Sequence, residues 1–314
     1  MCTAVTYKAK DYYFGRNLDL DRSYGECVVI TPRKYEFQLR CVALLKEHYA
    51  MIGMATVVGG YPLYYEATNE KGLSMAGLNF PYNAEYKEHE EGKDNIAPFE
   101  FIPWILGQCA NLDEVRVLMD RINLVKVNFS EKLPLTPLHW IISDSNHSIT
   151  VECIKSGLRI YENPYGVLTN NPTFDYHMMN LNNYMGLHEG LAANNLCPTE
   201  ELDNYSLGLG AFGLPGDFSS ASRFVRAVFV KQKSSPGSTE KESVSQFFHI
   251  LNSVAMPKGC VMSVDGQYEY TRYSSCCNTN KGIYYYTTYD CSTVTAVDIH
   301  AVELNQAEIY KYEI

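Results

Sequence analysis

The chain has 314 residues, of which 46% are hydrophobic and 20% charged, a composition that excludes an intrinsically disordered protein. A chain of this length buries a large core, so it needs neither disulfides nor a structural metal for stability. Acidic residues outnumber basic ones by 36 to 26, giving a net charge of −10, which argues against binding to nucleic acids or anionic membranes.

The first 80 residues are predicted to form strands. Their apolar segments are short, often alternate with polar residues, and are bounded by Gly, Asn, Asp and Pro. The polar stretch 85–96 that follows is predicted to be a solvated loop. The predicted strands are residues 3–7, 12–17, 27–31, 50–58 and 73–78.

Helices and further strands are predicted in the rest of the chain. Apolar residues recur at helical spacing from 112 to 122, behind Asn111, which is a suitable N-cap. The predicted strands and helices follow one another in groups along the chain, without the regular strand–helix alternation of a parallel doubly wound sheet. We therefore predict an α+β fold with two largely antiparallel sheets and helices outside them. The other predicted helices are 174–185, 220–231 and 243–254, and the other strands are 139–143, 149–153, 282–288 and 293–299.

The ten cysteines show no C-x-x-C spacing and no dense disulfide framework of the kind found in small secreted domains. Lys8, Lys10 and Asp11 leave no apolar segment for a signal peptide. The histidines show no paired metal-ligand spacing. We therefore expect a cytoplasmic protein with mostly reduced, buried cysteines and no metal.

Cys2 is the first candidate catalytic residue. Removal of the initiator Met is efficient when the next residue is small, and it would leave Cys2 as the free N-terminus. One residue would then carry a thiol nucleophile and an α-amine with an ordinary pKa of about 7.7–8.0, the N-terminal-nucleophile arrangement for amide cleavage. The alternative is a cysteine that stands at position 2 by chance.

A charged pair follows in the segment F-G-R-N-L-D at 14–19. A hairpin that folds 12–19 beside 2–7 would bring Arg16 and Asp19 near Cys2. A guanidinium stabilises a thiolate, and a carboxylate orients an amine. The alternative is a surface ion pair.

Three loop segments carry further polar groups. An Asn in a loop can donate a hydrogen bond to the oxyanion of a tetrahedral intermediate. A turn, an Asx-turn or a helix cap is the structural alternative for each segment. The segments are G-L-N-F-P at 77–81, L-T-N-N-P at 168–172, and G-L-P-G-D-F at 213–218 leading into S-S-A-S-R-F at 219–224.

Taken together, these motifs resemble the choloylglycine hydrolase family, which comprises bile salt hydrolases and penicillin V acylases. The resemblance covers nearly the whole chain and is closest to the bile salt hydrolases. It implies a single domain over residues 1–314 with the four-layer αββα N-terminal nucleophile hydrolase fold, a cytoplasmic homotetramer and no cofactor. It rests on Cys2-Thr3, F-G-R-N-x-D at 14–19, N-E-K-G-L at 69–73, A-G-L-N at 76–79, L-T-N-x-P at 168–172 and S-R-F at 222–224.

The resemblance also implies roles for individual residues. Cys2 would supply the nucleophile and its amine the base, while Arg16 and Asp19 position that amine and tune the thiol. The oxyanion hole would consist of the Asn79 backbone N–H and the Asn170 side-chain amide, with Asn171 as the neighbouring amide. Arg223 would complete the polar network. The family's substrate-pocket positions fall on apolar or aromatic residues, which suits a steroid: Leu18, Tyr24, Val58, Phe129 and Leu133.

The function that follows is cleavage of the amide bond of glycine- or taurine-conjugated bile salts through a thioester intermediate. Penicillin V acylase is the runner-up, since it uses the same catalytic set with a different pocket. An inactive relative that binds bile salts without cleaving them is a third possibility. The intact catalytic set argues against it, because a pure binder has no need of an N-terminal cysteine.

Overall fold

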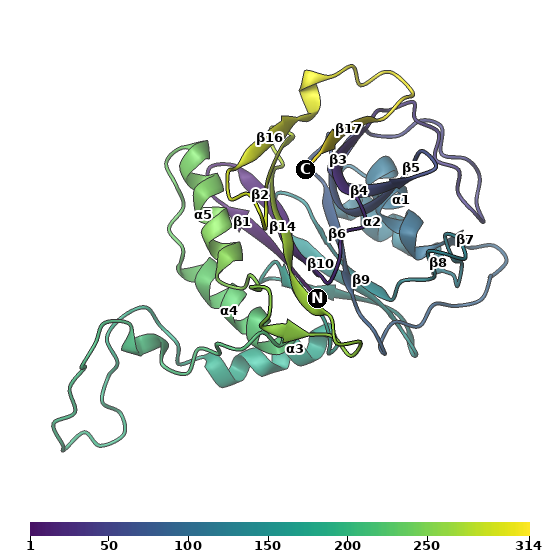
Figure 1. Ribbon diagram of the computed structural model, residues 1–314. Coiled ribbons are helices and arrows are strands. Elements are labelled where there is room, and N and C mark those ends of the chain that lie inside the picture. Colours follow the sequence, from purple (N-terminus) through teal and green to yellow (C-terminus); the bar gives the residue numbers. More distant parts are fainter.

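Two antiparallel sheets lie face to face in the centre of the computed structural model, which describes residues 1–314 (Figure 1). Helices α4 (Ser220–Lys233) and α5 (Glu240–Asn252) cover the outer face of the first sheet. Helices α1 (Phe101–Gln108) and α2 (Leu112–Met119) lie on the outer side of the second. The predicted αββα arrangement is therefore confirmed.

The first sheet has seven strands and contains both the N-terminal strand and a long strand near the C-terminus. Strand β1 pairs with β2, which in turn pairs with β14, so the N-terminal hairpin lies beside a strand from the C-terminal part of the chain. The strands, in spatial order, are β12 (Val167–Leu168), β1 (Cys2–Lys8), β2 (Tyr12–Leu20), β14 (Tyr268–Asn278), β15 (Ile283–Thr288) and β16 (Thr295–Asp298), with β13 (Val261–Met262) paired to β14.

The second sheet has eight strands, and a separate parallel pair, β7 (Asp94–Ile96) and β8 (Ile122–Leu124), stands beside it. No helix combines the length and the hydrophobicity that are needed to cross a membrane. The eight strands are, in spatial order, β11 (Gly157–Glu162), β10 (Ser148–Ile154), β9 (Leu138–Ser143), β6 (Ser74–Asn79), β5 (Tyr61–Asn69), β4 (Met51–Val58), β3 (Glu26–Thr31) and β17 (Tyr310–Glu313).

Alternating side chains give the second sheet two apolar faces. In β3, Val28 and Ile30 belong to the core between the sheets, whereas Cys27 and Val29 belong to the core under α1 and α2. This follows from the two-residue period of a strand. The inter-sheet core continues through the first sheet to α4 and α5, so all four layers pack on apolar contacts.

Several predicted boundaries were wrong. The helix predicted over 112–122 ends at Met119, and Ile122 begins strand β8. The helix predicted over 174–185 is α3 (Phe174–Asn180) followed by a 3₁₀ turn. Strand β14 was not predicted because both its faces are buried and a bulge interrupts its register, so it shows no alternation. Helix α1 was also not predicted, because it is apolar on all sides and its sequence therefore shows no helical periodicity.

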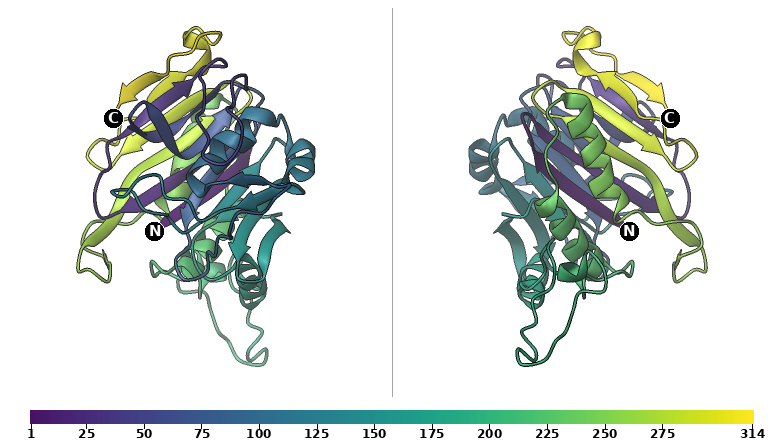
Figure 2. Two further views of the ribbon diagram at one scale, coloured as in Figure 1. Left: turned by 90° about the vertical axis from the view of Figure 1, so that its right-hand side faces the viewer. Right: turned by 90° about the vertical axis from the view of Figure 1, so that its left-hand side faces the viewer.

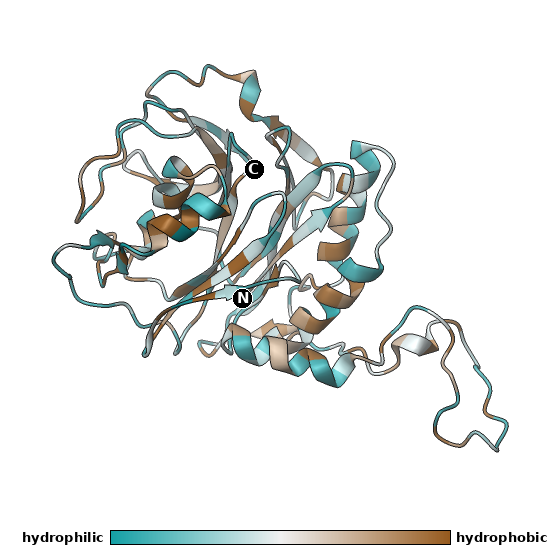
Figure 3. Ribbon diagram, turned by 180° about the vertical axis from the view of Figure 1, so that it is seen from behind, coloured by the Kyte–Doolittle hydropathy of each residue, from teal (hydrophilic) through white to brown (hydrophobic).

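The chain between α3 and α4 loops away from the layered body (Figures 1 and 2). Figure 3 shows that this segment, the excursion between α3 and α4, contains both apolar and polar residues, although it lies outside both hydrophobic cores. Large apolar side chains on it are at least four-fifths exposed: Leu196, Tyr205, Leu207 and Phe212.

Candidate active site

The β1–β2 hairpin places Cys2 beside the two charged residues of β2. Cys2 begins β1, is only 3% exposed, and pairs with Leu18, while Ala4 pairs with Arg16. Side chains three positions apart on a strand point to opposite faces, so Arg16 and Asp19 approach the start of β1 from opposite sides of the sheet. Both are fully buried, which rules out the surface ion pair.

Arg16 lies between the two sheets. Its Nη1 donates hydrogen bonds to the carbonyls of Tyr65 (3.0 Å) and Gly77 (2.6 Å), while Nη2 has no partner in the structure. Burial opposes its charge, yet the nearby Cys2, Tyr273, Glu66 and Asp19 hold the pKa of Arg16 above its usual value. A fixed cation with a free N–H donor therefore lies close to Cys2.

Asp19 lies on the helix side of the sheet. Its Oδ1 accepts a hydrogen bond from Thr271 Oγ1 at 2.6 Å, whereas Oδ2 is buried with no partner. Burial raises the pKa of Asp19, and the positive charges of the N-terminal amine and Arg223 oppose that rise. Asp19 Oδ2 is thus an acceptor in need of a donor.

Met1 extends the pairing of β1 with β2. Its ammonium donates to the carbonyl of Asp19 (2.6 Å) and to Glu269 Oε2 (2.5 Å), and its own carbonyl accepts from the Asp19 N–H (3.0 Å). With Met1 attached, the nitrogen of Cys2 is a peptide N–H.

Arg223, on α4, contacts Cys2 from the helix layer. Its Nη1 donates to the Cys2 carbonyl (2.5 Å) and to Thr3 Oγ1 (2.6 Å), and its Nη2 donates to Asn170 Oδ1 (2.7 Å). Burial lowers the pKa of Arg223. Three polar groups, one each on Cys2, Thr3 and Asn170, are therefore organised around one buried guanidinium.

Asn170 connects Cys2 to the end of β6. Its Oδ1 accepts from the Cys2 N–H (2.9 Å), and its Nδ2 donates to the carbonyl of Asn79 (2.7 Å). Its backbone is fixed as well, because its N–H donates to Ser220 Oγ and its carbonyl accepts from His177 Nε2. The amide nitrogen of Asn170 and the backbone of Asn79 are therefore close together.

Asn171 faces elsewhere. Its Nδ2 donates to the carbonyl of Pro81 and to Asn83 Oδ1 (2.6 Å), so it holds the turn that follows β6. Of the two neighbouring amides, Asn170 is the one that contacts Cys2.

The five apolar pocket positions come from separate segments. Leu18 is buried opposite Cys2, Tyr24 is half exposed in the β2–β3 connection, and Val58 ends β4. The Phe129 ring packs against Tyr61 and Phe99, and Leu133 follows on the same loop. Two surface hollows lie away from Cys2, one of about 670 Å³ around Arg33 and Glu70 and one of about 560 Å³ around Thr6 and Lys231.

Several residues that support the site were not predicted from the sequence. Ser220, His177 and Thr271 hold the backbone or side chain of Asn170 and Asp19. Glu66 approaches Arg16 Nε at 3.8 Å and accepts from Ser275, Tyr273 and Tyr284. Ser220 lies in the S-S-A-S-R-F segment, but its contact with Asn170 could not be read from that motif, and the other residues stand in no short motif, so only the fold could reveal these roles.

Comparison with known proteins agrees with this geometry. The chain is 53% identical to a bile salt hydrolase/transferase of Lactiplantibacillus plantarum, over 100% of this chain and 97% of the relative. It is 39% identical to a bile salt hydrolase/transferase of Clostridium perfringens, over 99% and 97% of the two chains.

Solved structures show the same fold. A crystal structure of a conjugated bile acid hydrolase from Clostridium perfringens superposes with a TM-score of 0.91 at 38% identity, covering 100% of this chain and 97% of that one. A penicillin V acylase from Agrobacterium tumefaciens shares the fold, with a TM-score of 0.79 at 20% identity, covering 99% of this chain and 90% of that one. The family model of linear amide C–N hydrolases matches residues 2–312, and the chain belongs to the choloylglycine hydrolase family.

Proposed function

We propose that this protein is a bile salt hydrolase that cleaves the amide bond of glycine- or taurine-conjugated bile salts. The observation that carries the proposal is the convergence of Asn170, Arg223 and Arg16 on Cys2, in a chain that aligns over its full length with bile salt hydrolases. Penicillin V acylase is less supported, because the acylase resemblance at 20% identity concerns the fold alone.

The proposed active form lacks Met1. Removing it turns the Cys2 peptide nitrogen into an α-amine and releases the Asp19 backbone and Glu269 from their contacts with Met1. The new ammonium would have more protons to donate than the peptide N–H, and the unpartnered Asp19 Oδ2 offers an acceptor for one of them. Asn170 Oδ1 would keep its hydrogen bond to this nitrogen.

The reaction proceeds in two steps. The Cys2 thiol passes its proton to the α-amine, and the sulfur attacks the amide carbonyl carbon to form a tetrahedral intermediate. The C–N bond breaks, the α-ammonium protonates the departing glycine or taurine nitrogen, and a thioester remains. Water, deprotonated by the same amine, then attacks the thioester, and the C–S bond breaks to give the free bile acid and the thiol. The relatives are also named transferases, and an amine in place of water would give that reaction.

The surrounding residues stabilise the charges that develop. Asn170 Nδ2 and the Asn79 N–H would donate to the oxyanion, and the contact between Asn170 and Asn79 keeps these groups together. The free Nη2 of buried Arg16 would face the thiolate. Arg223 donates hydrogen bonds to both the Cys2 carbonyl and the Asn170 side chain and so holds the two residues in a fixed relative position. Its role would therefore be to position the nucleophile.

Leu18, Tyr24, Val58, Phe129 and Leu133 are proposed to hold the steroid. A steroid offers a large apolar surface, and burial contributes about 25 cal/mol per Å². A phenoxyacetyl group is smaller and would leave part of such a wall unfilled. We expect conjugated bile salts to exceed penicillin V at least tenfold in kcat/KM, a difference of only about 1.4 kcal/mol.

We further propose a single domain over residues 1–314 that assembles as a cytoplasmic homotetramer. The exposed apolar side chains of the excursion between α3 and α4 support assembly, because a monomer would leave them in water. Light scattering on the native chain and on a variant with Leu207 and Phe212 changed to Ser tests this proposal. A native chain that is monomeric at micromolar concentration would refute it.

The function is tested by mass measurement of the N-terminus together with amine release from glycocholate, taurocholate and penicillin V. We expect the chain that begins at Cys2 to release glycine and taurine. A variant with an uncleavable N-terminal extension should fold but turn over negligibly. Full activity with a confirmed extension would exclude the mechanism, and faster release from penicillin V would move the assignment to the acylases.

A further inference from the structure

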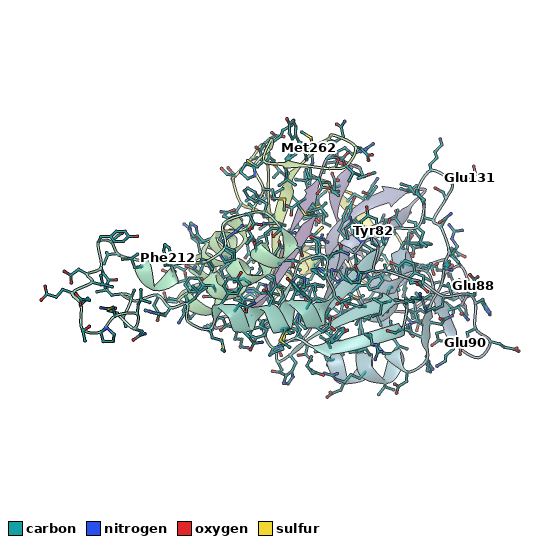
Figure 4. The ribbon with its side chains drawn as sticks, turned by 90° about the horizontal axis from the view of Figure 1, so that it is seen from below. Tyr82, Glu88, Glu90, Glu131, Phe212 and Met262 are labelled. Atoms are coloured by element: carbon teal, nitrogen blue, oxygen red, sulfur yellow. The ribbon has the colours of Figure 1, made fainter.

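Tyr82 has an unusual backbone for its residue type. It is the one residue other than glycine with a positive φ, +66°. A side chain in this left-handed region brings Cβ close to the following carbonyl, a cost that glycine avoids. Tyr82 is also 95% exposed and lies outside both hydrophobic cores, and Figure 4 labels it in the view from below. The fold of the monomer therefore gains little from a tyrosine here.

The turn that carries Tyr82 is held on both sides. The Asn171 side chain donates to the Pro81 carbonyl and to Asn83 Oδ1 (2.6 Å). The Ala84 N–H donates to the Phe80 carbonyl (3.1 Å), and the Phe80 ring stacks on His139 at 4.1 Å. The structure thus imposes the strained conformation on Tyr82, and such strain is commonly found at functional sites.

The turn also lies beside the proposed oxyanion hole. Asn170 Nδ2 contacts the carbonyl of Asn79, and the adjacent Asn171 contacts Pro81, so two consecutive amides tie the two segments together. Tyr82 follows Asn79 by three residues, which limits their Cα separation to about 11 Å. The backbone that carries an exposed aromatic side chain is therefore held within about 11 Å of Asn79, whose N–H is proposed for the oxyanion hole.

We propose that Tyr82 is a substrate-contacting specificity residue whose ring packs on the apolar acyl group of the substrate, an inference that rests on the proposed function. A tyrosine ring offers an apolar face with a polar edge, which suits a large apolar group at a solvent-exposed rim. The steroid nucleus is such a group, whereas the glycine or taurine part is small and polar. The strain at Tyr82 is then the structural cost of presenting the ring.

The test compares Tyr82→Phe, Tyr82→Ala and Tyr82→Gly with the wild-type enzyme after removal of Met1. Loss of the ring in the Ala and Gly variants should raise KM for glycocholate and taurocholate equally, by roughly fivefold, as expected when about 40 Å² of apolar surface is no longer buried. The Phe variant should keep the wild-type KM, and KM for penicillin V should change less than twofold. Val117→Ala, an exposed apolar change on α2, is the matched control and should have no effect.

Thermal unfolding gives a second, independent result. Tyr82→Gly relieves the strain and should raise Tm by about 1–2 °C, while Tyr82→Ala should not. An unchanged KM in the Ala and Gly variants, an effect on one conjugate alone, or a change in oligomeric mass without a change in KM would overturn the proposal. A wild-type enzyme that releases no glycine or taurine would instead refute the proposed function, so the two failures are distinguishable.

Discussion

Replacing Asn170 by Ala should separate its catalytic contribution from its structural one. The substitution removes the Nδ2 donor proposed for the oxyanion, which should lower kcat by roughly 10²–10³. KM should change less, because this donor matters most once charge develops on the carbonyl oxygen. The change also leaves the Cys2 nitrogen and Arg223 Nη2 without their acceptor. An unsatisfied buried donor costs about 1–3 kcal/mol, so the free energy of unfolding should fall by about 3 kcal/mol.

Asn171→Ala is the matched control. Asn171 also donates two hydrogen bonds, to Pro81 and Asn83, but does not contact Cys2. Urea titration measures the loss of stability, and initial rates of amine release on saturating glycocholate measure kcat. We expect comparable losses of stability in the two variants and a much larger loss of kcat for Asn170→Ala. A greater loss of kcat in Asn171→Ala would refute the assignment of the oxyanion donor.

Three further predictions concern the nucleophile, the pocket and the pH dependence of stability. Cys2→Ser should lose nearly all amine release, because a hydroxyl is far less ionised than a thiol at neutral pH; retention of most of the rate would contradict the nucleophile assignment. Phe129→Ala should raise KM for taurocholate and glycocholate more than for penicillin V, and equal effects in steady-state assays would argue against a steroid wall that includes this ring. Burial lowers the pKa of His177 to about 4, so its stabilising contribution should be complete above pH ~6.5 and lost as the pH falls towards 4. Between pH 7 and 4 the free energy of unfolding, measured by urea titration, should fall on the order of 3 kcal/mol more in the native chain than in His177→Gln. Equal falls in the two proteins would show that protonation of His177 does not cause this pH dependence.

The sequence predicted the family and the layered α+β fold, and both are confirmed. Short motifs made this prediction possible. Cys2-Thr3 and F-G-R-N-x-D lie on β1 and β2, which are consecutive in the sequence and pair as a hairpin. Where a strand is buried on both faces, as β14 is, the two-residue period disappears and so does the signal. Helix α1 was missed for the corresponding reason, because it is buried all round.

The proposed site was only partly visible in the sequence. The motif T-N-x-P pointed to Asn170 but could not show that its Oδ1 is shared by Cys2 and Arg223, a contact across 53 residues of chain from Arg223 and 168 from Cys2. Glu66 and His177 stand in no recognisable pattern, and their roles depend on which strands and loops are neighbours in space. The strain at Tyr82 is equally invisible, because N-F-P-Y-N is compatible with an ordinary turn.

The central claim is that Cys2, freed of Met1, is the residue that carries the acyl group. Mass spectrometry of enzyme mixed with glycocholate and quenched in acid within the first turnovers tests it most directly, because acid preserves thioesters. We predict a peptide that begins at Cys2, lacks Met1 and carries one cholyl group. Amine release from an enzyme whose cholyl group is found on another residue, or whose active fraction retains Met1, would contradict the account.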